Sequence, residues 1–434
     1  MSELLETIKN EPDVRRLGQK MTKTWFDSLI GAKQAGRPVA FVFVMGAMAD
    51  LLRSFDFELI YPEILALQSA VRKESPKYFR TAEAAGYPVD ICNYVKADVG
   101  MWLDGGIHAL GQIPKPDLVL SNHLCGIYIK WAEIYERMFD CPSFTIDIPM
   151  FRSSASAYLA EPPERPTDRR WLTSQVKDLI DLCEEITGRK LDLDRLAEIE
   201  SWRNEMADLY KEILQLNASR PAPFDVFDEG TVFMGNMNAW RGTPEGVAYL
   251  RRVRDDLKAK VAAGISPIGK ESFRLLVSGV VPWMAWREFM DLFHEQGGVF
   301  VSGDYLSIAS EGFDRSSIRY DVDHPLESLV EVTLAATGNG CGAAIFADIL
   351  IPDLARFFEV DGIVYHGIKS CRTSSAAMPA NREYFTRIGL EAPSLYIESD
   401  HMDKRYWSGA QLKNRVDAFF EVLRSRALAN AGGR

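Results

Sequence analysis

The stretch VAFVFVM at residues 39–45 is a short, uninterrupted apolar run, and it is the first of a series that decides the fold. The breaker AGRP precedes it, and helix-like stretches such as YPEILALQSAVRKE and GIYIKWAEIYERMF separate the later runs. These later runs lie at residues 57–62, 88–92, 117–121, 143–149, 273–279, 297–304, 361–367 and 393–399. Apolar strands that alternate with helices predict an α/β protein with parallel sheets and crossover helices.

The order of these patterns predicts four regions, as expected for a chain of 434 residues, which is longer than one typical core. Residues 1–36 have the pattern of an amphipathic helical lead-in, and residues 37–160 form a first α/β domain. The proline-rich EPPERPTDRR closes that domain, and residues 161–262 form a helical connecting region. Residues 263–434 then form a second α/β domain that ends in the amphipathic helix NRVDAFFEVLRSRAL.

The composition is that of an ordinary globular protein, with 47% hydrophobic and 26% charged residues. No apolar run approaches the ~18 residues of a membrane span, and the start, MSELLETIKNEPDVRR, lacks the apolar core of a secretion signal. Six cysteines are too few for a disulfide scaffold. The net charge of −11 comes without a long basic stretch. We therefore expect a cytoplasmic protein that binds neither membranes nor nucleic acids.

Three cysteines lie just after apolar, strand-like runs, each in a short polar turn: Cys92 in VDICNYVKAD, Cys125 in LVLSNHLCGIY and Cys371 in GIVYHGIKSC. Ligands bind at the carboxyl ends of strands in open α/β sheets, so we expect the three thiols to converge there. None belongs to a CxxC pair, which argues against ferredoxin-type and zinc-ribbon sites. Three thiolates could hold an iron–sulfur cube with one iron left open to substrate. The alternative is that they are small buried hydrophobic residues.

The other cysteines are weaker candidates for cluster ligands. Cys183 lies on the apolar face of DLIDLCEEI and is expected to pack in the core. Cys141 precedes Pro142 at the start of a strand. Cys341 opens a helix after GNG, and since a helix N-terminus can lower the pKa of a thiol, it is the main competitor for a ligand role.

Three polar residues near these cysteines are candidates for catalysis, namely His123 in SNHLC, and His366 and Lys369 in YHGIKSC. Histidine can donate a proton near neutral pH, so His123 or His366 could serve as the proton donor. Lys369 could stabilise an anionic intermediate. The alternatives are buried structural histidines and a lysine that only solvates a loop.

Two further observations concern ligands. No glycine-rich turn matches a nucleotide-binding GxGxxG or GxxxxGK[ST] loop, and no GxSxG elbow is present, so any ATP that is needed should bind to another protein. Five aromatic residues could line an apolar pocket for a planar acyl group or could fill the core. They are Phe233, Trp240, Trp283, Trp286 and Tyr305.

Three stretches, PDLVLSNHLCG, DGIVYHGIKSC and YIESD followed by GAQLKNRVDAFFE, resemble the family of 2-hydroxyacyl-coenzyme A dehydratases and benzoyl-coenzyme A reductases. The resemblance covers most of the chain. The stretch CNYVKADVGM is most similar to the larger cluster-bearing (beta) subunit of ATP-dependent benzoyl-CoA reductases.

The resemblance implies two Rossmann-like domains with a 4Fe–4S cluster between them, held by three cysteines that correspond to Cys92, Cys125 and Cys371. It also implies a heterodimer with a related, smaller cluster-bearing subunit. A separate ATP-hydrolysing activator, with ferredoxin as the upstream donor, would deliver the electrons. The carrier's phosphates would need cations, for which the candidates are Lys270, Arg274, Arg315 and Arg319.

The activity that this resemblance implies is an anaerobic oxidoreductase reaction on CH–CH groups, in which benzoyl-CoA is dearomatised to a cyclohexadiene-carbonyl-CoA. A first alternative is a dehydratase subunit for an aromatic or branched 2-hydroxyacyl thioester. A second is a relay subunit that carries a cluster and binds no acyl group. A third is an α/β binding protein without a metal, whose cysteines belong to the core.

Overall fold

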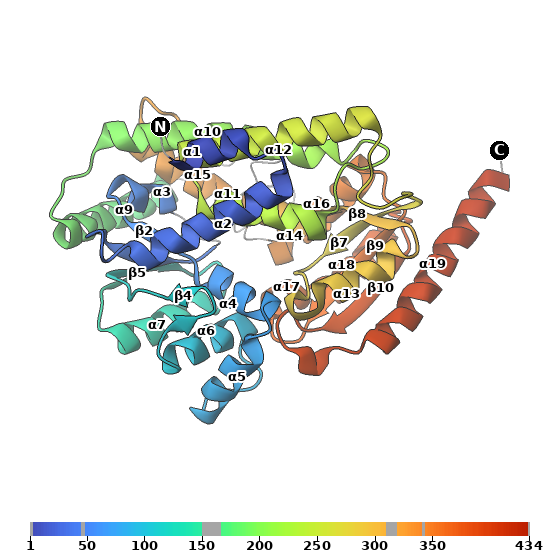
Figure 1. Ribbon diagram of the computed structural model, residues 1–434, viewed down its shortest axis with the longest axis horizontal. Helices are drawn as coiled ribbons and strands as arrows, with labels where there is room; N and C mark the ends of the chain where they lie inside the picture. The colour runs from blue at the N-terminus through green and yellow to red at the C-terminus, as the bar shows by residue number, and fades with distance from the viewer. Residues whose placement is uncertain (1–2, 45–47, 150–165, 310–318, 341–342, 433–434) are drawn as a thin grey trace.

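The computed structural model describes residues 3–44, 48–149, 166–309, 319–340 and 343–432. Its framework is two four-stranded parallel sheets, which lie below a layer of long helices in Figure 1. The predicted fold class, α/β with two Rossmann-like parallel sheets, is confirmed. Within the described residues, every helix is too short or too polar to cross a lipid bilayer.

The first sheet has the strand order β2–β1–β5–β6, and all neighbouring strands are parallel. Every residue of the central strands β1 and β5 is buried, which is the pattern of a parallel sheet covered on both faces. The strands are β1 (Val39–Val42), β2 (Glu58–Ile60), β5 (Leu118–Asn122) and β6 (Ser143–Ile146). The helices between them are α3 (Ala49–Ser54), α4 (Pro62–Val71), α5 (Ser75–Ala84), α6 (Asn93–Leu103) and α7 (Tyr128–Phe139).

The second sheet has the strand order β10–β9–β7–β8 and is also parallel. Its strands are β7 (Phe273–Ser278), β8 (Gly298–Gly303), β9 (Gly362–Ile368) and β10 (Ser394–Ser399). The helices of this half are α13 (Trp286–His294), α14 (Asp304–Ala309), α15 (Pro325–Gly340), α16 (Ala343–Phe357), α17 (Arg372–Ser375), α18 (Met378–Arg387) and α19 (Gly409–Gly432). The last of these extends along the right edge of Figure 1 to the C-terminus.

The remaining helices belong to the N-terminal lead-in and to the helical connecting region. They are α1 (Glu3–Asn10), α2 (Val14–Gly31), α9 (Pro166–Thr187), α10 (Leu193–Leu216), α11 (Thr231–Ala239) and α12 (Pro244–Ala263). At the start of three of these helices, the N-cap side chain accepts a hydrogen bond from a backbone N–H group that has no partner inside the helix. The N-cap residues are Asp13 for α2, Asp192 for α10 and Thr243 for α12. Cys183 on α9 is fully buried in the core around the first sheet, as expected.

One predicted strand is wrong. Residues 88–92, PVDIC, form a turn between α5 and α6, and Val89 is 48% exposed. Apolar residues alternate in this segment, but it is short and lies on the surface, without a neighbouring strand to pair with. Cys92 therefore reaches the site from the start of a helix.

The predicted domain boundaries fall on different kinds of structure. Residue 36 lies between α2 and β1, residue 160 lies outside the described residues, and residue 262 is within the last turn of α12. The division into domains stays a prediction.

Candidate functional site

The start of α6 positions Cys92, which is the N-cap residue of that helix. The backbone amides of Tyr94 and Val95 in the first turn of this helix favour the ionised form of the Cys92 thiol, against the larger effect of burial. The position of α6 is set by close packing on α5 at Gly100, where an added Cβ would lie 1.9 Å from the carbonyl oxygen of Tyr78. A side chain at residue 100 would therefore push α6, and Cys92 with it, away from α5.

Cys125 and Cys371 follow strands of different sheets. Cys125 lies between β5 and α7, and Cys371 follows β9 as the N-cap residue of α17. The Sγ atom of Cys125 lies 3.7 Å from Oγ1 of Thr373, two residues after Cys371. Strands of two different sheets thus bring these two thiol-bearing turns to one junction.

The three thiols interact with one another electrostatically. Burial raises the pKa of Cys92 well above its ordinary value, and negative charge on Cys371 and Cys125 would raise it further. Burial likewise raises the pKa of Cys371 to about 11, with a smaller contribution from Cys125. All three cysteines are free and partly buried. Three segments that are far apart in the sequence therefore bring their thiols into one neighbourhood.

The three cysteines have the donor chemistry of iron–sulfur ligands. Among the residues that the structure describes, no three His, Cys, Asp or Glu side chains lie close enough to hold one ion. A four-iron cube is wider than an ion and spaces its thiolate ligands farther apart. Three free thiols without a disulfide partner are the ligands that such a cube prefers.

A cavity of about 380 Å³ lies near these thiols, although none of the three cysteines lines it. Aromatic residues from both halves of the chain form much of its wall: Trp25, Phe26, Tyr94, Trp283, Trp286 and Tyr305. Three of the five aromatic residues suggested by the sequence are among them. The other two lie elsewhere, since the ring of Phe233 packs on Phe224 and the indole N–H of Trp240 donates to the backbone of Met21.

Glu63 is a buried carboxyl group in the wall of this cavity, at the start of α4. The backbone N–H of Val44 donates to its Oε1 atom at 3.1 Å. Burial raises the pKa of Glu63 to about 7, although the hydroxyl of Tyr128 and the amide of Val44 favour its ionised form. The carboxyl can therefore exchange a proton near neutral pH.

Two tyrosines of the same wall form a hydrogen-bonded chain. The indole N–H of Trp283 donates to the hydroxyl of Tyr94 at 2.6 Å, and the hydroxyls of Tyr94 and Tyr305 bond to each other. Burial raises the pKa of both tyrosines, so both hydroxyls keep their protons.

Each thiol is electrostatically coupled to one polar residue of the cavity. Burial is the largest cause of the raised pKa of Cys125, and the negative charge of Glu63 raises it further. In the same way, burial raises the pKa of Tyr94 and of Tyr305, with smaller contributions from Cys92 to Tyr94 and from Cys371 to Tyr305. These three residues of the wall therefore lie within electrostatic range of the thiols. Sequence reasoning missed Glu63 and Tyr94, although Glu63 follows a strand end in ELIYPE and Tyr94 is two residues after Cys92.

His366 is enclosed in the second sheet. It is fully buried, its Nδ1 bonds to the carbonyl of Val280, and its Nε2 lies 2.6 Å from Oγ of Ser399. Burial lowers the pKa of His366 to about 4, so the ring is neutral at pH 7. Both nitrogens are engaged and the residue does not line the cavity, which favours a structural role over that of a proton donor.

The other predicted candidates make surface contacts. His123 is partly buried, and its Nδ1 lies 3.3 Å from Oδ1 of Asp147. Lys369 is about half exposed and forms an ion pair with Glu398. Cys341 lies outside the described residues.

Two cations suggested for the carrier's phosphates are already engaged. Arg274 is buried, where it pairs with Glu271 and donates to backbone carbonyls, so its proposed phosphate contact is wrong. Arg319 forms an ion pair with Asp208. Arg315 lies outside the described residues.

Comparisons with known proteins agree on one family. Residues 38–423 match the family model of the 2-hydroxyglutaryl-CoA dehydratase D-component. The chain is 31% identical over 430 residues to a benzoyl-CoA reductase subunit of Thauera aromatica, with 96% of each chain covered. It is 27% identical to the (R)-2-hydroxyisocaproyl-CoA dehydratase alpha subunit of Clostridioides difficile, over 92% of this chain and 94% of that one. The chain therefore belongs to the 2-hydroxyglutaryl-CoA dehydratase D-component family.

Proposed function

We propose that this chain is the iron–sulfur subunit of an ATP-dependent, ferredoxin-driven benzoyl-CoA reductase. The observation that carries this proposal is the convergence of three free thiols near an aromatic-lined cavity. The 31% identity to a benzoyl-CoA reductase subunit over nearly the whole chain supports the choice of substrate. The product would be a cyclohexadiene-carbonyl-CoA.

Cys92, Cys125 and Cys371 would hold the 4Fe–4S cluster. When bound, such a cluster supplies electrons one at a time, at a potential tuned by nearby charges and hydrogen bonds. The sequence has no nucleotide-binding loop of the GxGxxG or GxxxxGK[ST] type, so ATP would be hydrolysed by a separate activator that receives electrons from ferredoxin. The relatives are named as subunits, which supports a heterodimer with a smaller, related cluster-bearing subunit.

The cavity would hold the planar acyl group. The rings of Trp283, Trp286 and Tyr305 offer apolar surface for a phenyl ring and exclude water. Exclusion of water matters because a reduced ring must be protonated by a group of defined position rather than by solvent. The volume of about 380 Å³ is within the usual range for a small-molecule site.

Glu63 would provide the proton. Its Oε1 accepts the N–H of Val44, so a proton is better placed on Oε2. A carboxyl with a pKa of about 7 is a suitable general acid at neutral pH. His123 stays a second candidate, whereas the contacts of His366 and Lys369 favour structural and surface roles.

A dehydratase of 2-hydroxyacyl thioesters is the second candidate function, favoured by the family model and by the 27% identical relative. An anaerobic assay of the complete complex with benzoyl-CoA and with phenyllactyl-CoA separates the two. We expect ATP-dependent turnover of benzoyl-CoA. Turnover of the hydroxyacyl substrate alone would contradict the reductase, and turnover of neither by an iron-loaded complex would favour a relay subunit.

A further inference from the structure

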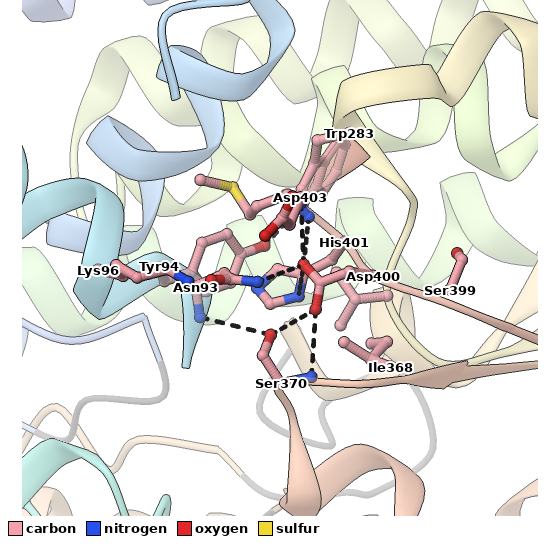
Figure 2. Close-up of polar contacts among 12 residues, drawn as sticks. Asn93, Tyr94, Lys96, Trp283, Ile368, Ser370, Ser399, Asp400, His401 and Asp403 are labelled. Carbon is pink, nitrogen blue, oxygen red and sulfur yellow. Dashed lines mark hydrogen bonds and ion pairs between the residues drawn. The ribbon is translucent and has the colours of Figure 1, made fainter. Parts of the chain in front are cut away.

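Asp400 is a buried carboxylate at the end of β10 that accepts hydrogen bonds from three separate segments (Figure 2). Its Oδ1 accepts from the side chain of Asn93 at 2.8 Å and from the backbone N–H groups of Met402 and Asp403 at 2.8 and 3.0 Å. Its Oδ2 accepts from the backbone N–H and the hydroxyl of Ser370, at 3.1 and 2.6 Å. Five donors surround this one group.

The two distant partners of Asp400 are direct neighbours of proposed cluster ligands. Asn93 follows Cys92 at the start of α6, and Ser370 precedes Cys371 after β9. The two partners also bond to each other, since the backbone N–H of Asn93 donates to the hydroxyl of Ser370 at 3.4 Å. Asp400 therefore connects the thiol-bearing turns of the two halves of the molecule.

The charge of Asp400 is fixed by its surroundings. Only donors face the two oxygens, a setting that favours the ionised carboxylate. Burial opposes ionisation, but His401 and these hydrogen bonds hold the pKa of Asp400 below its usual range. Burial in turn lowers the pKa of His401, the one ion-pair partner of Asp400 among the described residues, so that its ring is neutral at pH 7.

Among the described residues, no lysine or arginine pairs with Asp400, and two cations of this region are engaged by other acids. Arg405 pairs with Asp403 and Glu83, and Lys96 pairs with Glu83. The negative charge of Asp400 is thus not cancelled locally, and in a medium of low dielectric constant it acts over several ångströms.

We infer that Asp400 is a positioning residue that fixes the spacing of the Cys92 and Cys371 turns and sets a permanent negative charge beside the cluster. This inference rests on the proposed function. A fixed negative charge next to a redox centre disfavours the addition of an electron, so Asp400 would lower the potential of the cluster. A low potential is what a reaction that adds electrons to an aromatic ring requires.

Three substitutions separate the two roles. D400N removes the charge and replaces one of the two acceptor oxygens by an NH2 group. S370A and N93A each remove one bond to Asp400 and keep its charge. D403N is the matched control, because Asp403 is a buried acid of the same turn that pairs with Arg405 and bonds to neither cysteine turn.

The test is a redox titration, followed by electron paramagnetic resonance, of the anaerobically purified complex. We expect D400N to raise the reduced-to-oxidised ratio about tenfold at a fixed potential, which corresponds to about 59 mV for a one-electron couple. S370A and N93A should keep the wild-type midpoint but lose iron to a chelator several times faster. The inference would be overturned if D400N had the wild-type midpoint potential and the wild-type rate of iron loss, or if D403N shifted the midpoint potential as much as D400N.

An iron-free measurement keeps the positioning role testable on its own. A short bis-maleimide should bridge Cys92 and Cys371 in the apo chain, read by peptide mapping, and S370A and N93A should slow this reaction. Unchanged rates contradict the positioning role, even if D400N does not fold. Wild-type protein that never holds iron contradicts the proposed function instead, so the two failures are distinguishable.

Discussion

The two sheets have the same four-stranded parallel architecture, but their carboxyl edges differ in what they hold. The edge of the first sheet carries Cys125 and the buried acid Glu63, together with one hydrogen bond between Ser121 and Thr145 at 2.6 Å. The edge of the second sheet is closed by hydrogen bonds, from Ser278 to Asp304 at 2.7 Å and between His366 and Ser399 at 2.6 Å. Both halves supply thiols to the junction, and this comparison indicates that the proposed proton donor belongs to the first half, whereas the polar groups at the edge of the second sheet are held in hydrogen bonds.

The largest expected effect is on cluster binding. We expect Cys92→Ala, Cys125→Ala or Cys371→Ala to abolish the cluster, because two thiolates from different segments cannot hold a cube that needs three protein ligands. Iron and sulfide analysis of anaerobically purified protein measures this.

Two other cysteines provide controls for this prediction. Cys141 is free and partly buried, and Cys183 is free and packs in the core. Cys141→Ala and Cys183→Ala should keep the wild-type iron content. Equal iron in the Cys371→Ala and Cys183→Ala variants would refute the assignment of ligands.

The second prediction concerns Glu63, in the first half of the chain. Glu63→Gln should lower the rate of ring reduction on the order of 10²-fold, since the amide cannot donate an acidic proton, and iron content should not change. The wild-type rate should fall as the pH rises above about 7, where Glu63 loses its proton. The rate of the variant should not depend on pH in this window.

Asp98 is a matched control for Glu63. It is a buried acid of the same half whose pKa burial also raises to about 7, but it accepts a hydrogen bond from Trp131 and does not line the cavity. Asp98→Asn should reduce stability and keep the pH-dependent rate. A proton donor other than Glu63 is indicated if Glu63→Gln retains the wild-type pH profile.

The third prediction concerns His366, in the second half of the chain. His366 has an ordinary pKa of 6.5, and burial lowers it to about 4 in the folded protein. The unfolded chain therefore binds more protons between these values, and the stability contributed by neutral His366 is present above pH 6.5 and is lost as the pH falls towards 4. At pH 5 the loss is about 2 kcal/mol.

Urea denaturation at pH 7 and pH 5 measures this loss. His366→Gln should be less stable than the wild type at pH 7 and should show a smaller difference between the two pH values. His123, whose Nδ1 lies 3.3 Å from the exposed Asp147, is the control, and His123→Gln should keep the wild-type difference. A similar pH dependence in His366→Gln and wild type would remove His366 as its cause.

The sequence predicted the two sheets well. Continuous apolar runs such as residues 39–45 and 117–121 are typical of strands in a parallel sheet that is covered on both faces. It failed at residues 88–92, where an equally apolar pattern lies on the surface. Cys125 and Cys371 follow strands, as the sequence predicted, but the strands belong to two different sheets, and the meeting of two sheets cannot be derived from local apolar runs. Cys92 arrives by another route, from a helix start.

The supporting acids could not be recognised in this way. Glu63 and Asp400 are ordinary residues in YPE and ESD, and their importance comes from burial and from partners more than 15 residues away in the sequence. Composition and local periodicity carry no information on either property. Lys369 is the opposite case, since its position beside Cys371 suggested a role that its contacts do not support.

Substitution of Lys369 has the smallest expected effect, and it tests directly whether the second half of the chain supplies a group that acts on the substrate. Its side chain is 48% exposed and pairs with Glu398, which is 44% exposed, and such surface ion pairs contribute less than about 1 kcal/mol to stability. Lys369→Ala should change the melting temperature by a degree or two, and the rate of ring reduction less than twofold. Lys413→Ala on α19, which removes another exposed ion pair, to Asp417, is the matched control. A much larger loss of rate in Lys369→Ala than in Lys413→Ala would mean that the second half also supplies a group that acts on the substrate, and the division of roles between the sheets would have to be abandoned.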